Sequence, residues 1–468
     1  MNPNEPARTD GNRTKRRTFL RLAGTGALAT AGLAGCVGTE DGGDGSDGDD
    51  GGSDGSDGSD GDDMDGEDGG STETPTGPES VLVGQPAAVT GQWDFLQPAV
   101  SQSADLAVQE INDAGGPLDA EFELQRRDTA VDPQQAREVV RQFINNDSVV
   151  AINGLFSSEI TPLWDFLQEQ EMPVVTPWPG TQFLDTRGGD KGTPGDLSDN
   201  EWAWRTVIGD TVHTAGGAQA MIDNDFGTIG VFNGTGAGET GYADAFVSAY
   251  ENLGGTIAER VEVPEGESSY QSQLDRLFDA DFDAWVLALA LEDATTAIQN
   301  WSQGGYGRQL LMEDGLMSPD LIDAVGEAAE GAWIAAGSTQ GPNYGSFESK
   351  FKQAGDADIH TWGVASYDAT NVLSLAIHRA GEASPEAIQQ NIGPVAREGG
   401  TTVSTFAEGK EALDAGEEIN YEGAVTNTDF TTHGNVWGNV AVSQVTPDGF
   451  DEQFSVGADT LQESIEQY

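Results

Sequence analysis

From residue 81 to near the end of the chain, short apolar runs alternate with stretches in which apolar residues recur every three or four positions. The first pattern is typical of buried strands and the second of amphipathic helices. Strands are predicted at 81–83, 121–124, 149–152, 173–175, 228–232, 285–289 and 310–312, and helices at 104–111, 133–144, 160–167, 213–223 and 242–252.

A polar, glycine-rich stretch at 186–200 interrupts this alternation. A series of strands and helices lies on each side of it, which predicts an α/β protein with two doubly wound, Rossmann-like lobes. Ligands of such lobes bind beyond the carboxyl ends of the strands, so a site is expected in the loops that follow the strands. Asp132-Pro133 has the residue types of a helix start and is expected to cap the helix at 133–144.

The segment before the first strand has a different composition. Residues 39–80 are dominated by glycine, aspartate and serine and include no basic or aromatic residue. Such a segment has no apolar surface to bury, so we expect a solvated, self-repelling tether. Its acidic repeats are too irregularly spaced to predict calcium-binding loops.

Residues 1–35 have the features of an export signal. Arg16 and Arg17 precede an uncharged stretch at 22–34 that is rich in alanine, glycine and leucine, as in a twin-arginine signal. That stretch is shorter than the roughly 20 residues of a membrane-spanning helix, and no later segment is suited to span a bilayer. The end of the signal, at 33–36, resembles a lipobox, so we expect cleavage before Cys36, a lipid on its thiol and a tether at 36–80. Cys36 is the only cysteine, which excludes an internal disulfide.

The charge of the chain restricts its partners and indicates its habitat. Aspartate and glutamate number 80 against 21 lysines and arginines, which gives a formal net charge of −59. Nucleic acid is excluded as a partner because phosphate binding needs the opposite sign. At about 1 M salt the screening length falls to roughly 3 Å, which relieves the repulsion within a compact acidic fold. The acidity therefore indicates adaptation to a very salty, haloarchaeal type of habitat.

Several short segments follow one another in a distinctive order. They are Thr90-Gly91, AVQEINDAGG at 107–116, Arg127-Asp128-Thr129 followed by Asp132-Pro133, GLFSS at 154–158, PVVTP at 173–177, GEAAEG at 326–331 and SYDA at 366–369. The ordered set resembles the branched-chain amino-acid (Leu/Ile/Val) binding protein family of periplasmic-type receptors. The resemblance extends from Val81 almost to the end of the chain.

This resemblance implies a type I periplasmic binding protein fold, with two lobes joined by three hinge strands. One lobe is expected at 81–205 plus 337–425, and the other at 206–336 plus 426–468. The implied function is that of a solute receptor of an ABC importer and not that of an enzyme. Such a receptor uses no cofactor. Such a receptor closes on a small polar solute, here a branched-chain or related amino acid, and delivers it to permease and ATPase subunits.

A receptor for a free amino acid needs hydroxyl or amide donors for the carboxylate and an acidic acceptor for the ammonium. By the resemblance, Ser157, followed by Ser158, supplies the hydroxyl that binds the carboxylate, although a serine before a helix could instead be only a cap. Gly180 and Thr181 fall where the family holds the ends of the ligand. The preceding Trp178-Pro179 makes this loop one residue longer than in the family.

The same resemblance assigns the remaining candidates. Asp210 and Asp314 align with acidic cleft residues, the second with the family's ammonium partner, although an aspartate in so acidic a chain could also be solvated surface. Trp93, Phe95 and Trp362 lie near positions that face the ligand side chain, and packing in the core is the alternative for each.

Two positions depart from the family. Near Gly238 and Ala290, relatives with branched-chain ligands often have tyrosines, and this chain has none there. The wall of the second lobe is therefore expected to be smaller and less aromatic, which leaves room for a different or larger ligand.

A competing hypothesis starts from Gly236-Ala237-Gly238-Glu239-Thr240-Gly241, a literal G-x-G-x-x-G between a predicted strand and a predicted helix. This is the dinucleotide fingerprint, with Glu259 or Glu262 as the ribose acceptor, and would indicate an exported NAD-dependent oxidoreductase. No acid–base histidine or lysine accompanies it. A ligand-sensing receptor without transport partners is the other alternative. The four histidines, His213, His360, His378 and His433, are scattered along the sequence and predict no metal-ligand cluster.

Overall fold

The structure is a computed structural model that describes residues 78–465, apart from 92, 146–147 and 194. The described residues belong to one unit, Thr72–Tyr468. The expectations about Arg16, Arg17, Cys36 and the acidic segment concern residues 1–77 and lie outside the described residues.

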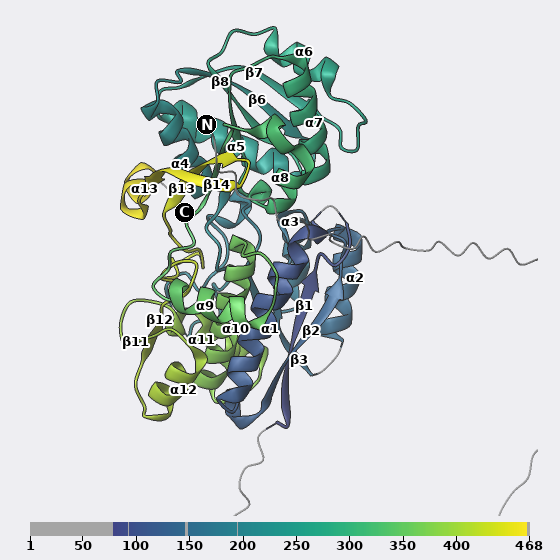
Figure 1. Ribbon diagram of the computed structural model, residues 1–468. Helices are drawn as coiled ribbons and strands as arrows, with labels where there is room; N and C mark the ends of the chain where they lie inside the picture. The colour runs from purple at the N-terminus through teal and green to yellow at the C-terminus, as the bar shows by residue number, and fades with distance from the viewer. Residues whose placement is uncertain (1–77, 92, 146–147, 194, 466–468) are drawn as a thin grey trace, which may run out of the picture. The chain divides into compact units, whose positions relative to one another are not determined.

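The first sheet is parallel, with the strand order β2-β1-β3-β4-β5. Its strands are β1 (Ser80–Ala87), β2 (Glu121–Asp128), β3 (Val149–Asn153), β4 (Val174–Thr176) and β5 (Ala203–Arg205). All residues of β3 are buried, as expected of a strand that is covered on both faces. The packing helices are α1 (Gln97–Asp113), α2 (Pro133–Ile144), α3 (Ser157–Glu169), α9 (Tyr344–Ala354), α10 (Thr361–Ala380), α11 (Pro385–Val395) and α12 (Phe406–Asp414). Helices α1 and α10 pack on each other, and Figure 1 shows them across the sheet from α2.

The second sheet has the order β14-β13-β10-β9-β8-β6-β7. Strands β6 (Thr228–Gly234), β7 (Thr256–Val263), β8 (Ala284–Ala288), β9 (Gln309–Met312) and β10 (Trp333–Gly337) are parallel, while β13 (Val440–Thr446) and β14 (Gly449–Val456) are antiparallel additions. The helices of this part are α4 (Asp210–Asp223), α5 (Ala237–Asn252), α6 (Gln271–Phe278), α7 (Leu291–Gly304), α8 (Pro319–Val325) and α13 (Ala458–Ser464). A small separate sheet pairs β11 (Thr401–Val403) with β12 (Ile419–Tyr421).

The chain passes between the two large sheets at three places: between β5 and α4, between β10 and α9, and between β12 and β13. The two-lobed α/β architecture with three connections predicted from the sequence is therefore confirmed. We call the part built on the first sheet the first lobe and the part built on the second sheet the second lobe.

The individual elements agree closely with the sequence pattern. Asp132 caps α2 as expected, because its Oδ1 atom accepts hydrogen bonds from the backbone amides of Gln134 and Gln135 at 2.9 and 2.8 Å. Four helices begin earlier than predicted: α1 at Gln97 instead of 104, α3 at Ser157 instead of 160, α4 at Asp210 instead of 213, and α5 at Ala237 instead of 242. The apolar periodicity did not reveal these first turns because they consist mainly of glycine and polar residues.

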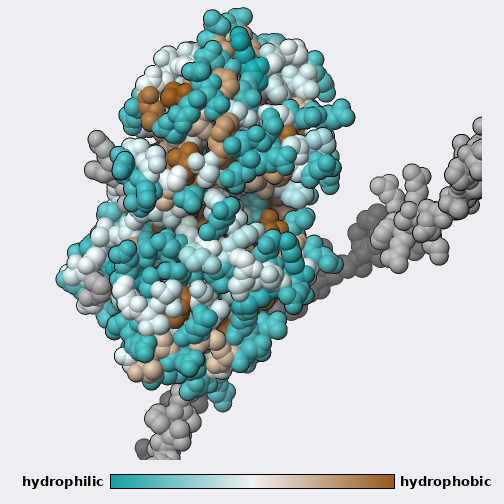
Figure 2. Space-filling view, turned by 60° about the vertical axis from the view of Figure 1, so that its left-hand side comes forward, coloured by the Kyte–Doolittle hydropathy of each residue, from teal (hydrophilic) through white to brown (hydrophobic). Residues whose placement is uncertain are grey.

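The face of the molecule shown in Figure 2 is largely hydrophilic, with only scattered apolar residues. Among the described residues, the only large apolar side chain counted as exposed is that of Val89. No helix within this part of the chain combines the length and the apolar character that a membrane span requires.

Candidate functional site

A cavity of about 290 Å³ lies where loops of the two lobes meet. The first lobe contributes the loops after β1, β2, β3 and β4, and the second contributes those after β6, β7 and β9, together with the start of α4. These loops all follow the carboxyl ends of parallel strands, where ligands of doubly wound sheets bind. The cavity is lined by Trp93, Ala130, Val131, Pro133, Phe156, Ser157, Ser158, Trp178, Gly180, Asp210, Gly236, Ala237, Gly238, Glu239, Tyr242, Glu265, Glu313, Asp314, Gly315 and Trp362.

The wall from the first lobe is largely aromatic. The rings of Phe156 and Trp178 are stacked with centroids 4.8 Å apart, and Trp362 meets Phe156 edge-on at 5.6 Å. Trp93 lies 5.5 Å from Trp362 and completes the group. We call these four residues the aromatic wall. The indole Nε1 of Trp178 donates to the Ser366 hydroxyl at 3.0 Å, so this ring is held in place by a satisfied polar contact.

Two serines lie beside the aromatic wall at the start of α3. The hydroxyl of Ser157 accepts a hydrogen bond from the Thr181 amide at 3.3 Å, and that of Ser158 donates to the Val131 carbonyl at 3.4 Å. The N-cap position of α3 is Phe156, so Ser157 is not the capping residue. Free amides in the first turn of a helix favour an anion, which makes this end of the cavity suitable for a carboxylate.

The wall from the second lobe is acidic. Asp210, Glu239, Glu313 and Asp314 all line the cavity and are all buried. We call these four residues the acidic wall. Burial first, and then the charge of neighbouring carboxylates, raises the pKa of Asp210 and of Glu313 well above the ordinary values. The same two causes raise the pKa of Glu239, with Glu265 and Asp293 as its charged neighbours.

Arg205 supports this region from the end of β5 without lining the cavity. Its guanidinium is buried, pairs with the Asp185 carboxylate at 2.9 Å, and donates to the carbonyls of Gly180 and Thr181 at 3.0 and 3.2 Å. It therefore fixes the loop that carries Gly180. The sequence analysis missed this residue, because a single arginine before a helix carries no recognisable signal.

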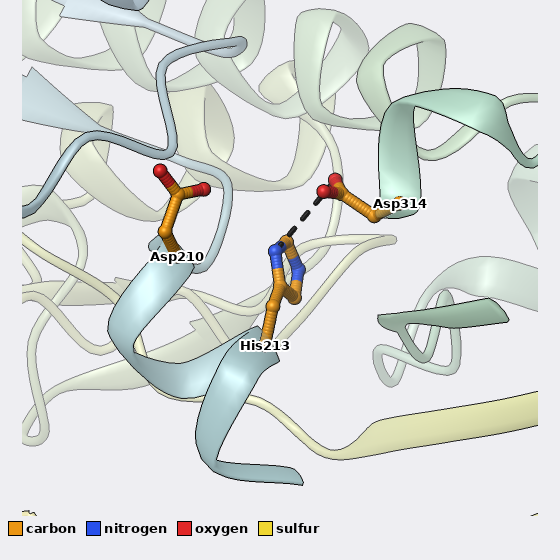
Figure 3. Close-up of side chains that lie close together, drawn as sticks. All are labelled: Asp210, His213 and Asp314. Carbon is orange, nitrogen blue, oxygen red and sulfur yellow. Dashed lines mark ion pairs between the residues drawn. The ribbon is translucent and has the colours of Figure 1, made fainter. Parts of the chain in front are cut away.

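Asp210 and His213, of which only the first lines the cavity, come together with Asp314, which also lines it (Figure 3). The first two extend from α4, and Asp314 reaches them from the turn after β9, with its Oδ2 atom 3.6 Å from Nδ1 of His213. One potential ligand atom from each lies within 4.8 Å of the others, and this donor set could hold a metal ion such as zinc. The sequence analysis, which treated the histidines as scattered, did not detect this arrangement.

The imidazole of His213 is fully enclosed. Burial lowers its pKa, with the Asp314 carboxylate acting in the opposite direction. Among the described residues, neither ring nitrogen has a hydrogen-bond partner. Asp314 is therefore positioned between this ring and the cavity, with an oxygen available to each.

The structure brings most of the expected binding residues together. Ser157, Ser158, Gly180, Asp210, Asp314, Trp93 and Trp362 all line the cavity. Two others do not: Thr181 contributes its amide to Ser157, and Phe95 packs against Trp93 with ring centroids 6.0 Å apart.

Gly238 lines the cavity without a side chain, whereas Ala290 is buried away from it. The expectation of a less aromatic second wall is modified by Tyr242, whose side chain does line the cavity from α5. The sequence analysis also missed Glu239 and Glu313. In a chain with 80 acidic residues, nothing in the sequence separates these from solvated carboxylates.

The environment of the G-x-G-x-x-G segment argues against dinucleotide binding. A Cβ atom placed on Gly236 would lie 2.2 Å from Oε2 of Glu239 and 2.7 Å from Oε1 of Glu265. Two carboxylates therefore occupy the position from which a pyrophosphate would approach the helix, and like charges repel there. Four of the six residues, at 236–239, instead line the solute-sized cavity.

Comparison with known proteins agrees with this architecture. The chain is 22% identical over 313 residues to the "Leucine-, isoleucine-, valine-, threonine-, and alanine-binding protein" of Pseudomonas aeruginosa, covering 66% of this chain and 80% of that one. It is 23% identical over 371 residues to the "Chemotactic signal transduction system substrate-binding protein BasB" of Halobacterium salinarum, covering 75% and 84%.

Among solved structures, the leucine binding protein LivK of Thermotoga maritima superimposes with a TM-score of 0.67 at 21% identity, covering 81% of this chain and 99% of that one. These relatives are named as binding proteins rather than enzymes. The family model described as "Periplasmic binding protein" matches residues 80–450. The chain belongs to this periplasmic binding protein family.

Proposed function

We propose that this chain is an extracellular solute receptor of an ABC import system, which captures a small polar solute by closure of two lobes and delivers it to permease and ATPase subunits. The observation that carries the proposal is a solute-sized cavity lined by both lobes within a family match that spans 80–450. A cavity shared in this way couples binding to the relative position of the lobes, because only a closed protein satisfies both ends of the solute.

The proposed lobes are 81–205 plus 337–425 and 206–336 plus 426–468, with the three connections between the sheets as hinges. Close contacts across the cavity support closure. The backbone amide of Asp210 donates to the Gly180 carbonyl at 2.7 Å. A Cβ atom on Gly315 would lie 2.8 Å from the Trp93 ring, so the turn after β9 lies directly against the aromatic wall.

An amino acid is the first ligand class to test. The Pseudomonas relative is named for leucine, isoleucine, valine, threonine and alanine. In the proposed complex, the hydroxyl of Ser157 and the first turn of α3 bind the carboxylate, and Asp314 with Asp210 binds the ammonium. Ser158, Gly180 and Trp362 complete the enclosure.

The ligand class can be tested with the full-length chain carrying Cys36→Ser, purified in molar salt. Thermal unfolding is measured with amino acids, short amides, organic acids and NAD. A ligand at a hundred times its dissociation constant stabilises the protein by about 2.7 kcal/mol. Stabilisation by an amino acid, with compaction in small-angle scattering, supports the proposal. A response to NAD alone would overturn it.

We propose further that the chain is exported by a twin-arginine signal and anchored to the outer face of the membrane by a lipid on Cys36. The strongly acidic surface suits a very salty environment outside the cell. Changing Arg16 and Arg17 together to lysine should leave precursor inside the cell. Cys36→Ser should release soluble protein into the medium, and membrane retention of that variant would contradict the anchor.

One comparison favours a second candidate function. The relative from Halobacterium salinarum is named as a component of a chemotactic signal transduction system, and the match spans 75% of this chain. The same receptor fold would then report solute concentration to a transducer. Deletion of the gene distinguishes the two functions: loss of solute uptake supports import, whereas normal uptake with lost chemotaxis supports sensing.

A further inference from the structure

The acidic wall holds more carboxylates than one ammonium group can balance. Asp210, Glu239, Glu313 and Asp314 come from three separate places, the start of α4, the first turn of α5 and the turn after β9, and each is less than a tenth exposed. Glu265 also borders the cavity. The lining residues in the described part of the chain include no lysine, arginine or histidine.

The basic side chains nearest to the acidic wall do not supply a counter-charge within the cavity. Arg205 donates to three loop carbonyls, to Asn435 and to Asp185. His213 is buried and does not line the cavity. A buried carboxyl group without a counter-charge holds its proton more strongly, and a cation that enters the cavity is favoured because it stabilises the ionised form of such groups.

Two buried polar atoms at or beside the acidic wall are unsatisfied within the part of the chain that the structure describes. The Oε1 atom of Glu313 and the phenolic oxygen of Tyr242 have no hydrogen-bond partner among the described residues, and both side chains line the cavity. A group that donates hydrogen bonds would satisfy both, because Glu313 accepts and the hydroxyl of Tyr242 can do so too. An ammonium or guanidinium group offers several such donors.

The opposite wall suits the same chemistry. Trp93, Phe156, Trp178 and Trp362 form a continuous group of rings with neighbouring centroids 4.8 to 5.6 Å apart. The face of an aromatic ring attracts a cation, most strongly where both are removed from water. Aromatic rings opposite buried carboxylates are a recurrent arrangement for holding a cationic nitrogen group.

We propose that the solute of this receptor carries a net positive charge, with a cationic nitrogen group held between the acidic wall and the aromatic wall. This inference rests on the proposed function and narrows its ligand class. Leucine, isoleucine and valine would place an uncharged side chain against this wall and leave its excess carboxylates unbalanced. A basic amino acid and a polyamine share the required chemistry, and only the first carries the carboxylate that Ser157 and α3 would bind.

Calorimetric titration of the full-length Cys36→Ser chain tests the inference, in molar salt with a chelator present so that divalent ions do not contribute. The cationic probes are L-lysine, L-arginine and putrescine. L-norleucine is the matched neutral probe, because it has the carbon chain of lysine without the side-chain ammonium group. L-leucine is the second neutral probe. At least one cation should bind at least about tenfold more tightly than either neutral amino acid, since it adds a charged hydrogen bond.

The titrations also separate the two sources of the cation. If lysine or arginine binds and putrescine does not, the solute is a basic amino acid. If putrescine binds and the two amino acids do not, the solute is a polyamine. The inference is wrong if leucine or norleucine binds as tightly as the best cation, or if no cation binds. If, in either case, a neutral amino acid binds and compacts the protein, the proposed function as a solute receptor stands and only the inference of a cationic solute is abandoned. If no solute of either kind compacts the protein, the proposed function fails as well.

Two isosteric substitutions connect the result to the acidic wall. Glu313→Gln and Glu239→Gln each remove a charge with little change in shape, so affinity for the preferred cation should fall roughly tenfold or more while affinity for norleucine stays constant or rises. Glu251→Gln is the control, because Glu251 is exposed near the other end of α5. Equal behaviour of Glu239→Gln, Glu313→Gln and the control would overturn the inference. Thermal unfolding without solute verifies that each variant is folded.

Discussion

The two walls of the cavity differ in how completely the protein satisfies their polar atoms. In the aromatic wall and its neighbouring serines, Trp178 donates to Ser366, and Ser157 and Ser158 both have partners. In the acidic wall, Glu313 has an oxygen without a hydrogen-bond partner in the described part of the chain, and the same is true of the nearby Tyr242 hydroxyl. One wall is complete before a solute arrives, while the other depends on the solute for its counter-charge and its hydrogen-bond partners.

Buried carboxylates outside the cavity show that the fold satisfies such groups to different degrees. Asp368 accepts hydrogen bonds from the amides of Ala424 and Val425 and from the hydroxyl of Tyr421. Burial raises its pKa to about 6, and these hydrogen bonds oppose the rise. Glu159 and Asp429, which do not line the cavity, each also have an oxygen atom without a hydrogen-bond partner among the described residues. What distinguishes Glu313 is that its unpartnered oxygen belongs to a side chain that lines the cavity, where a solute can supply the donor.

The largest effect is expected from breaking the acidic wall at Asp314. Asp314→Asn keeps the shape but removes the charge that pairs with the ammonium of the solute, so affinity should fall about ten- to a hundredfold, or roughly 1.5 to 3 kcal/mol. Calorimetry with the best-bound amino acid measures the change. Asp323→Asn on the nearby α8 is the control, because Asp323 is exposed. An unchanged affinity would show that the acidic wall does not bind the ammonium.

A somewhat smaller loss of affinity is expected from a substitution that pushes the two walls of the cavity apart. Gly315→Ala places a Cβ atom about 2.8 Å from the Trp93 ring, so closure requires the ring or the turn to move. Overpacking of this kind costs on the order of 1 to 3 kcal/mol, and affinity should fall by roughly tenfold. Small-angle scattering should show less compaction at saturating solute. Gly345→Ala, which meets no atom within 4 Å, should behave as the wild type.

Ser157→Ala tests the part of the cavity that lies beside the aromatic wall. The substitution removes a hydroxyl that would bind a carboxylate, so affinity for an amino acid should fall by up to about tenfold, whereas affinity for putrescine should not change. Titration of each ligand into the wild type and the variant gives the loss of affinity for the amino acid relative to that for putrescine. An equal loss for both would mean that the substitution disturbs the wall as a whole, through the lost contact with the Thr181 amide.

The smallest effect on binding is expected at Glu159, which lies buried behind the aromatic wall and accepts a hydrogen bond from the Phe156 amide at 2.8 Å. Burial raises its pKa to about 7, so the folded state retains a proton that the unfolded state loses near pH 4.5. Its contribution to stability is therefore fully present below about pH 4.5 and is lost as the pH rises through 7.

Glu159→Gln should flatten this part of the stability profile, measured by denaturant unfolding between these pH values, with solute affinity nearly unchanged. Glu169→Gln, at the exposed end of the same helix, is the control. A profile that is equally steep in Glu159→Gln and in the wild type would contradict the assignment of the proton to Glu159.

The pattern of apolar residues was sufficient to predict the strands of both sheets that it named and the faces of their helices. Burial of Ala136, Val139, Val140 and Phe143 in α2 follows directly from their spacing. The resemblance to the receptor family also singled out Ser157 and Asp314, both of which line the cavity, while their roles in binding stay predictions. These predictions succeeded because they depend on local periodicity and on the fixed positions of loops after strands.

The tertiary structure alone decided which of the many acidic residues matter. Glu239 and Glu313 are far apart in the sequence, and they meet because the parallel strands β6 and β9 bring their carboxyl ends to the same edge of the second sheet. Only burial distinguishes them from solvated carboxylates, and burial depends on how distant segments pack. For the same reason the sequence could not place Phe95 and Thr181 outside the cavity or Tyr242 within it.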